Sequence, residues 1–107
     1  MTYEEIAEAT KDFTKIIEPG QCNILIAHIG GWISHFEESL AEQTDKTTAI
    51  WSRLRDTYGS DKRTDRALEL TQEYKDQQTI KRQIGILRRL RSDLRDRFLV
   101  LTNLKRY

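Results

Sequence analysis

The stretch RQIGILRRLRSDLRDRFLVL, residues 82–101, combines an apolar seam with a high density of positive charge. Its leucines and isoleucines recur every three or four residues, which is the spacing of one face of an α-helix. Six arginines and only two aspartates stand among them. The pattern predicts a long amphipathic helix, and it raises the question of what so many arginines contact.

The predicted C-terminal helix runs from about residue 64 to about residue 105, because the glycine of YGSDKRTD (residues 58–65) ends the preceding helix. Apolar residues seven apart, at positions 80, 87, 94 and 101, give it a heptad-like repeat. The apolar stripe is wider than a two-stranded coiled coil needs, which favours either a helical hairpin packed on a third helix or a multi-subunit bundle. The expected oligomer interface consists of Ile80, Ile84, Leu87, Arg91, Leu94, Phe98 and Leu101.

Two further helices are predicted upstream of the glycine turn. Thr2 and Glu5 form a capping box that opens a short helix over about residues 2–17, and Glu18-Pro19-Gly20 ends it. The second helix is expected over about residues 23–58, with polar gaps at Gln43 and Thr47 in its apolar seam. Its adjacent glycines at 30 and 31 indicate a kink, a close helix contact or a later helix start.

Length and composition favour a single all-α domain over residues 1–107. The expected architecture is a short N-terminal helix followed by a helical hairpin with a long basic C-terminal helix, coiled-coil-like and assembled as an oligomeric bundle. Only 37% of the residues are hydrophobic and 33% are charged, so an isolated chain would have a thin core. Apolar seams shared between subunits would compensate for it, which makes a homo-oligomer the expected state.

Charge is distributed unevenly along the chain. Residues 1–53 carry four basic and nine acidic side chains, whereas residues 54–107 carry fourteen basic and eight acidic ones. Such asymmetry is typical of complementary pairing within or between chains, or of a basic face for a polyanion. Net charge of the whole chain is only +1 and identifies no partner by itself.

Cysteine content, the N-terminal segment and the longest apolar run bear on the cellular location. Cys22 is the only cysteine, so an intrachain disulfide is excluded and a reduced cytoplasmic compartment is expected. Residues 1–20 are acidic and amphipathic, unlike a signal peptide. No run reaches the roughly 20 apolar residues of a membrane span, so no membrane partner is expected.

Residues suited to catalysis are sparse. His28 and His35 are seven apart and would share a helical face, but no metal-ligand pair has the close spacing of a known motif. The sequence also contains no glycine-rich phosphate loop and no nucleophile elbow. We therefore expect no enzymatic activity, no catalytic residues, no metal and no cofactor.

The basic residues form rows and a cluster. Lys81, Arg88 and Arg95 are seven apart, and Arg82 and Arg89 form a parallel row one position on. Further basic residues surround the glycine turn, and the full set of candidate nucleic-acid-binding residues is Arg53, Arg55, Lys62, Arg63, Lys81, Arg82, Arg88, Arg89 and Arg95. Two interpretations stay open: these side chains neutralise phosphates, or they pair with acids of the second helix.

The aromatic residues are a second possible source of nucleic-acid contacts, because exposed rings can stack on bases. Tyr58 and Tyr107 are the expected exposed aromatics. Trp32 and Trp51 are expected in the core or at an interface.

The segments WSRLRDTYGSD (residues 51–61) and QEYKDQQTIKRQIGILRRLRSDLRDRF (residues 72–98) resemble small phage-encoded helical recombination mediators of the UvsY type. The resemblance covers roughly residues 33–104 and rests on helices, turn and charge. It implies a ring-like oligomer that binds single-stranded DNA and helps load a recombinase onto strands coated by single-strand-binding protein. In that family basic residues just before the turn contact DNA; Arg53 matches best and Arg55 is its neighbour, while Ser52 stands where another basic residue is expected.

The sequence thus predicts a non-catalytic single-stranded DNA-binding accessory protein that assists phage recombination or replication in the host cytoplasm. Expected partners are single-stranded DNA, further copies of the chain, and a recombinase or single-strand-binding protein. The alternative is a small phage protein-binding module, an inhibitor or adaptor of a host protein, without nucleic-acid binding.

Overall fold

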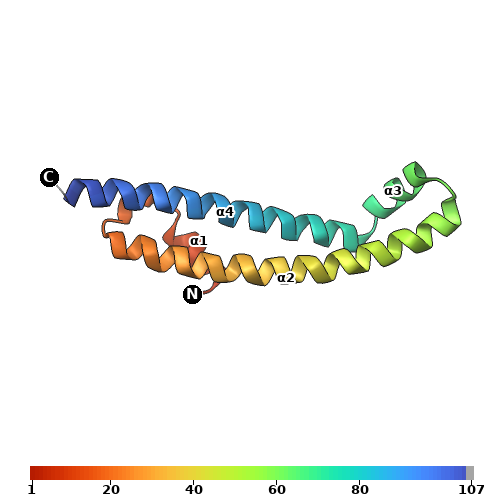
Figure 1. Cartoon of the computed structure of the whole chain (residues 1–107), viewed down its shortest axis with the longest axis horizontal. Coiled ribbons are helices and arrows are strands. Elements are labelled where there is room, and N and C mark those ends of the chain that lie inside the picture. The colour runs from red at the N-terminus through yellow and green to blue at the C-terminus, as the bar shows by residue number, and fades with distance from the viewer. Residues whose placement is uncertain (106–107) are drawn as a thin grey trace. The chain divides into compact units, whose positions relative to one another are not determined.

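The computed structural model describes residues 1–105, and its side chains are described as far as residue 103. Over these residues the chain is helical and contains no strand, which confirms the predicted all-α class (Figure 1). The elements are α1 (Tyr3–Ala9), the 3-10 helix η1 (Phe13–Lys15), α2 (Pro19–Tyr58), α3 (Asp61–Glu69) and α4 (Gln72–Lys105). They form two compact units, unit 1 with residues 1–35 and the chain from residue 85 onward, and unit 2 with residues 36–84.

Unit 1 begins with a helix shorter than predicted. The Thr2 side chain accepts the Glu5 backbone N–H at 3.1 Å, as the capping box requires, but α1 ends at Ala9 and not near residue 17. Asp12 interrupts the helix by accepting both the backbone N–H of Thr14 at 3.0 Å and its hydroxyl at 2.6 Å. These bonds replace hydrogen bonds that a continuing helix would make. The hydrogen bond from the Thr14 hydroxyl also lowers the pKa of Asp12.

The second helix starts four residues earlier than predicted, at Pro19 and not at Asn23. Proline is well suited to the first helical position, where an N–H has no helical partner. The Gln21 side chain accepts the backbone N–H groups of Ile17 and Glu18, each at 3.1 Å, and so fixes the approach to the helix. Gly30 and Gly31 both lie inside α2 without interrupting it, and a Cβ added at either would meet nothing within 4 Å.

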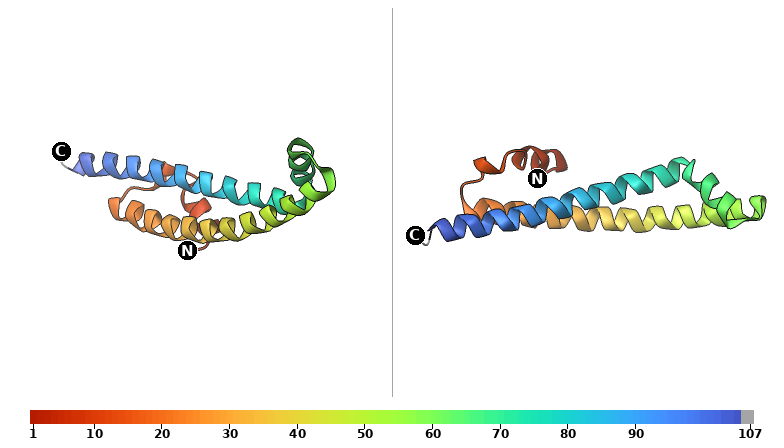
Figure 2. Two further views of the ribbon diagram at one scale, coloured as in Figure 1. Left: turned by 45° about the vertical axis from the view of Figure 1, so that its right-hand side comes forward. Right: turned by 90° about the horizontal axis from the view of Figure 1, so that it is seen from above.

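The core of unit 1 is aliphatic. In Figures 1 and 2 its parts of α2 and α4 run antiparallel side by side, with α1 on one side of the pair. Arg97 of α4 donates its Nε–H to the backbone carbonyl of Ile16 at 3.0 Å, which ties η1 to the last helix. The buried hydrophobic side chains are Ile6, Ile16, Cys22, Leu25, Ile29, Ile33, Leu87, Leu94 and Leu101, and the polar Thr10 is buried with them.

Unit 2 turns the chain at Gly59 as predicted, and the turn residue adopts a φ of +69°. The expected single helix over residues 64–105 is in fact two helices, α3 and α4, separated at Leu70 and Thr71. Thr71 accounts for the break, since its hydroxyl accepts the backbone N–H of Tyr74 at 3.2 Å and so caps the start of α4.

The interior of unit 2 is more polar than that of unit 1. Thr47, Thr64 and Gln77 are buried there, so the predicted polar gap at Thr47 lies in the core. Gln43 donates its side-chain N–H to the backbone carbonyl of Glu73 at 2.9 Å, and joins α2 to α4. Polar contacts of this kind take the place of the aliphatic packing seen in unit 1.

Candidate nucleic-acid interface

The part of α4 in unit 1 is strongly basic. Residues 85–105 carry six basic side chains against the two aspartates Asp93 and Asp96. Arg88, Arg89 and Arg95 are exposed, whereas Arg91 and Arg97 are half-buried. Such an excess of positive charge along one helix is a feature expected of a polyanion-binding segment.

These arginines lie on two faces of α4. Arg88 and Arg95 are seven positions apart and share a face, next to the buried seam. Arg89 follows the fully buried Leu87 by two positions, which places it about 200° around the helix at 3.6 residues per turn. Arg89 is exposed and therefore points away from the core.

The contacts of these arginines decide which are available to a ligand. Arg97 is engaged with the Ile16 carbonyl, and Arg88 also has a partner within the structure. Neither Arg89 nor Arg95 has a hydrogen bond or ion pair with any side chain that the structure describes. Among the residues that the structure describes, two of the three exposed arginines of this segment thus have guanidinium groups without a partner.

The basic cluster at the glycine turn belongs to unit 2. Arg55 donates its Nε–H to Asp61 Oδ1 at 2.6 Å and so closes the turn between α2 and α3. Arg53 is exposed and lines a shallow hollow of ≈ 280 Å³ together with Lys46 and Glu73. Of the two arginines that the resemblance implicates in DNA contact, Arg55 thus has a structural partner, and Arg53 has none among the described side chains.

The other predicted basic residues of unit 2 are all exposed: Lys62 and Arg63 on α3, and Lys81 and Arg82 on α4. Unit 2 as a whole carries nine basic and ten acidic side chains. Its basic residues are therefore interspersed with acids, and the clearest positive surface remains the α4 segment of unit 1.

The predicted oligomer seam lies largely inside the single chain. Ile84, Leu87, Leu94 and Leu101 have at most 7% of their surface exposed. The remaining members, Ile80, Arg91 and Phe98, are half-buried. The helices of one chain already cover this seam, so assembly of several copies would have to use other surfaces.

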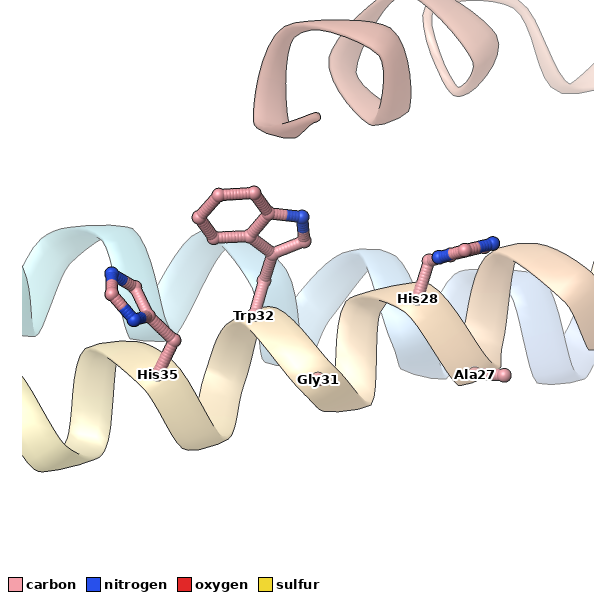
Figure 3. Close-up of a pocket in the computed structure, with 5 residues that line it drawn as sticks. All are labelled: Ala27, His28, Gly31, Trp32 and His35. Atoms are coloured by element: carbon pink, nitrogen blue, oxygen red, sulfur yellow. The ribbon is translucent and has the colours of Figure 1, made fainter. Parts of the chain in front are cut away.

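A hollow of ≈ 370 Å³ lies along α2 in unit 1, lined by Ala27, His28, Gly31, Trp32 and His35 (Figure 3). The Trp32 indole donates to the backbone carbonyl of Met1 at 2.9 Å, and its ring meets His35 edge-on with centroids 5.4 Å apart. Trp32 stands between the two histidines in Figure 3. Among the described residues no three potential metal ligands gather, here or elsewhere.

Sequence reasoning missed a cleft in unit 2. It has a volume of ≈ 340 Å³ and is lined by Thr44, Thr47, Thr48, Trp51, Leu68, Tyr74 and Gln77. The Trp51 indole donates to Asp65 Oδ1 of α3 at 2.8 Å. Trp51 was expected in the core or at an interface and is half-buried, and no sequence signal indicated that α3 would fold back toward it.

Cys22 lies in the core of unit 1, fully buried. Burial raises the pKa of its thiol above the ordinary value of 9.0, and the positive charge of Arg97 partly opposes this shift. Such a thiol is a poor nucleophile, because the reactive thiolate is disfavoured.

None of the helices in residues 1–105 combines the length and apolar character needed to cross a membrane. Neither protein-family models, nor curated proteins, nor solved structures give a match to this chain.

Proposed function

We propose that this protein binds single-stranded DNA without catalysing a reaction, and that the exposed arginines of α4 in unit 1 contact the phosphates. The observation that carries the proposal is that Arg89 and Arg95 are exposed and have no partner among the described side chains. A guanidinium that is not neutralised within its own chain is available to displace counterions from a nucleic-acid backbone.

The biological role proposed is that of an accessory factor in phage recombination or replication. This part rests on the resemblance of residues 33–104 to recombination mediators, with a recombinase or single-strand-binding protein as partner in the host cytoplasm. Assembly of several copies would multiply a small basic surface into one with high avidity. Contacts to phosphates carry no base information, so binding would be largely indifferent to sequence.

A pair of matched charge reversals tests the proposal. Arg89→Glu with Arg95→Glu is compared with Lys11→Glu and Lys15→Glu, which changes net charge equally at exposed residues outside α4. For two lost phosphate contacts, we expect the α4 variant to lower the slope of log affinity against log salt by about 1.4 for a single strand. The control should keep most of its slope.

Circular dichroism would establish that both variants remain folded, and sedimentation would record the size of any oligomer. Equal losses in the two variants would mean that binding follows total charge and that α4 is not the contact surface.

A further inference from the structure

The cleft of unit 2 is built by three helices. Thr44, Thr47, Thr48 and Trp51 come from α2, Leu68 from α3, and Tyr74 and Gln77 from α4. Its volume of ≈ 340 Å³ lies in the range of small-molecule sites. Aromatic, aliphatic and hydroxyl groups all line it, a combination typical of sites for flat ligands with polar edges.

Two aromatic rings form part of the walls, one held by a hydrogen bond of its own and the other carried by a backbone that is hydrogen-bonded at the start of α4. Trp51 is fixed by its 2.8 Å bond to Asp65, and the backbone of Tyr74 by its 3.2 Å bond to Thr71. Both rings are half-buried, and neither has a ring contact within the described structure. Their faces are therefore available for stacking on a ligand, and the hydrogen bond of Trp51 lowers the ordering cost for that ring.

Polar groups of the cleft retain free hydrogen-bonding capacity. Gln77 uses its side-chain N–H on the Thr44 hydroxyl at 3.3 Å, and its amide oxygen has no partner among the described residues. The hydroxyls of Thr48 and Tyr74 are likewise uncommitted there. The cleft thus offers both donors and acceptors to the edge of a planar ring.

Charge restricts the ligand further. The lining contains no basic side chain, and the Asp65 carboxylate lies next to Trp51. A phosphate or carboxylate would be repelled from the interior, whereas a neutral nitrogen heterocycle would not. A nucleotide would therefore enter with its base and leave its phosphate outside.

From these features we infer that the Trp51 cleft is a binding site for one unstacked nucleobase. The inference rests on the proposed function for the source of the base, a strand of DNA; a free nucleotide is the other source of the same chemistry. Stacking on an aromatic side chain tolerates any base, so the site adds affinity without demanding a sequence.

The fluorescence of Trp51 gives a direct test. Trp32→Phe removes the only other tryptophan, so the emission then reports on the cleft alone. Three probes are titrated: a thymidine oligonucleotide, an abasic strand of the same length, and thymidine monophosphate. The oligonucleotide should quench Trp51 to saturation, and the abasic strand, which has phosphates but no bases, should leave the emission unchanged.

Variants of the cleft supply the second part of the test. Tyr74→Leu removes one wall and should weaken base-dependent quenching at least about fivefold, the lower value for loss of one stacking contact. Tyr58→Leu is the matched control, because Tyr58 is exposed in the same unit and does not line the cleft. Thr48→Leu, at an exposed position, fills the cleft without removing a side-chain hydrogen bond of the described residues and should give a similar loss.

The outcomes separate this inference from the proposed function. Equal quenching by the abasic strand, or unchanged quenching in both Tyr74→Leu and Thr48→Leu, overturns the nucleobase site. If salt-sensitive strand binding persists without quenching, the proposed function stands and the cleft is not its base site. Saturating quenching by thymidine monophosphate without strand binding supports the nucleobase site and overturns the proposed function.

Discussion

The indole Nε1–H of Trp51 in α2 donates to the Asp65 carboxylate of α3 at 2.8 Å. The bond connects the longest helix to the nine-residue α3, which is too short to be stable alone in water. It also fixes one aromatic wall of the cleft in unit 2. A single side-chain contact thus contributes both to the fold of unit 2 and to the proposed base site.

Replacing Trp51 by phenylalanine should test the structural role of this bond. The ring is retained in part, but the donor is lost, so we expect the free energy of unfolding to fall by about 0.5–1.5 kcal/mol. Urea titration followed by circular dichroism measures the change. Asp65→Asn keeps an acceptor oxygen and should cost less; a larger loss in Asp65→Asn would show that the carboxylate charge, and not the indole bond, dominates.

Arg97 and Arg95 offer a contrast between a structural and a free arginine on the same helix. Arg97→Met removes the 3.0 Å bond to the Ile16 carbonyl while keeping an apolar stem, and should destabilise the protein by about 1 kcal/mol. Arg95→Met should change stability by less than about 0.5 kcal/mol, since Arg95 is exposed without a described partner. Thermal or urea unfolding of both variants measures the difference, and equal losses would contradict these assignments.

The class of the fold could be predicted from the sequence, but two of the helix boundaries could not. Apolar spacing predicted the helical class, and Gly59 correctly marked the end of α2 at Tyr58. The early end of α1 and the break between α3 and α4 were missed. Each depends on one side chain bonding to nearby backbone, Asp12 to Thr14 and Thr71 to Tyr74, and periodicity does not record such local competition.

For the candidate site, the sequence predicted which residues are basic but not which of them have a partner in the fold. The sequence does not distinguish Arg55, Arg89 and Arg97 from one another. In the structure Arg55 donates to Asp61 and Arg97 donates to a backbone carbonyl, whereas Arg89 has no partner among the described side chains. These partners come from other segments of the chain and depend on tertiary packing. The Trp51 cleft was missed for the same reason, because its walls come from three helices.

Two glycines in different backbone conformations should respond oppositely to alanine. Gly59→Ala places a side chain at a φ of +69° and should destabilise the protein by about 1 kcal/mol. Gly30→Ala lies inside α2 with nothing within 4 Å of the added Cβ, and should stabilise it by about 0.4–1 kcal/mol. Midpoints of thermal unfolding compare the two, and destabilisation by Gly30→Ala would indicate that α2 is interrupted there.

Reactivity of Cys22 reports on the core of unit 1. Because burial raises the pKa of its thiol above 9.0, the folded protein should react with a thiol reagent far more slowly than the urea-unfolded protein. The linked contribution to stability is complete below the thiol pKa of the unfolded chain and declines as pH rises toward the folded value. Cys22→Ser should remove the labelling, and rapid labelling of the folded wild-type chain would contradict a buried thiol.

In the proposed function, Arg89 and Arg95 of α4, which have no partner among the described side chains, bind the phosphates of single-stranded DNA. Fluorescence anisotropy of a labelled oligonucleotide, titrated with the protein at about 50 and 200 mM salt, tests it most directly. We predict binding at low salt that weakens steeply at high salt, with Arg89→Glu and Arg95→Glu removing much of that dependence. Absence of binding at low salt, or binding that salt leaves unchanged, would contradict the claim.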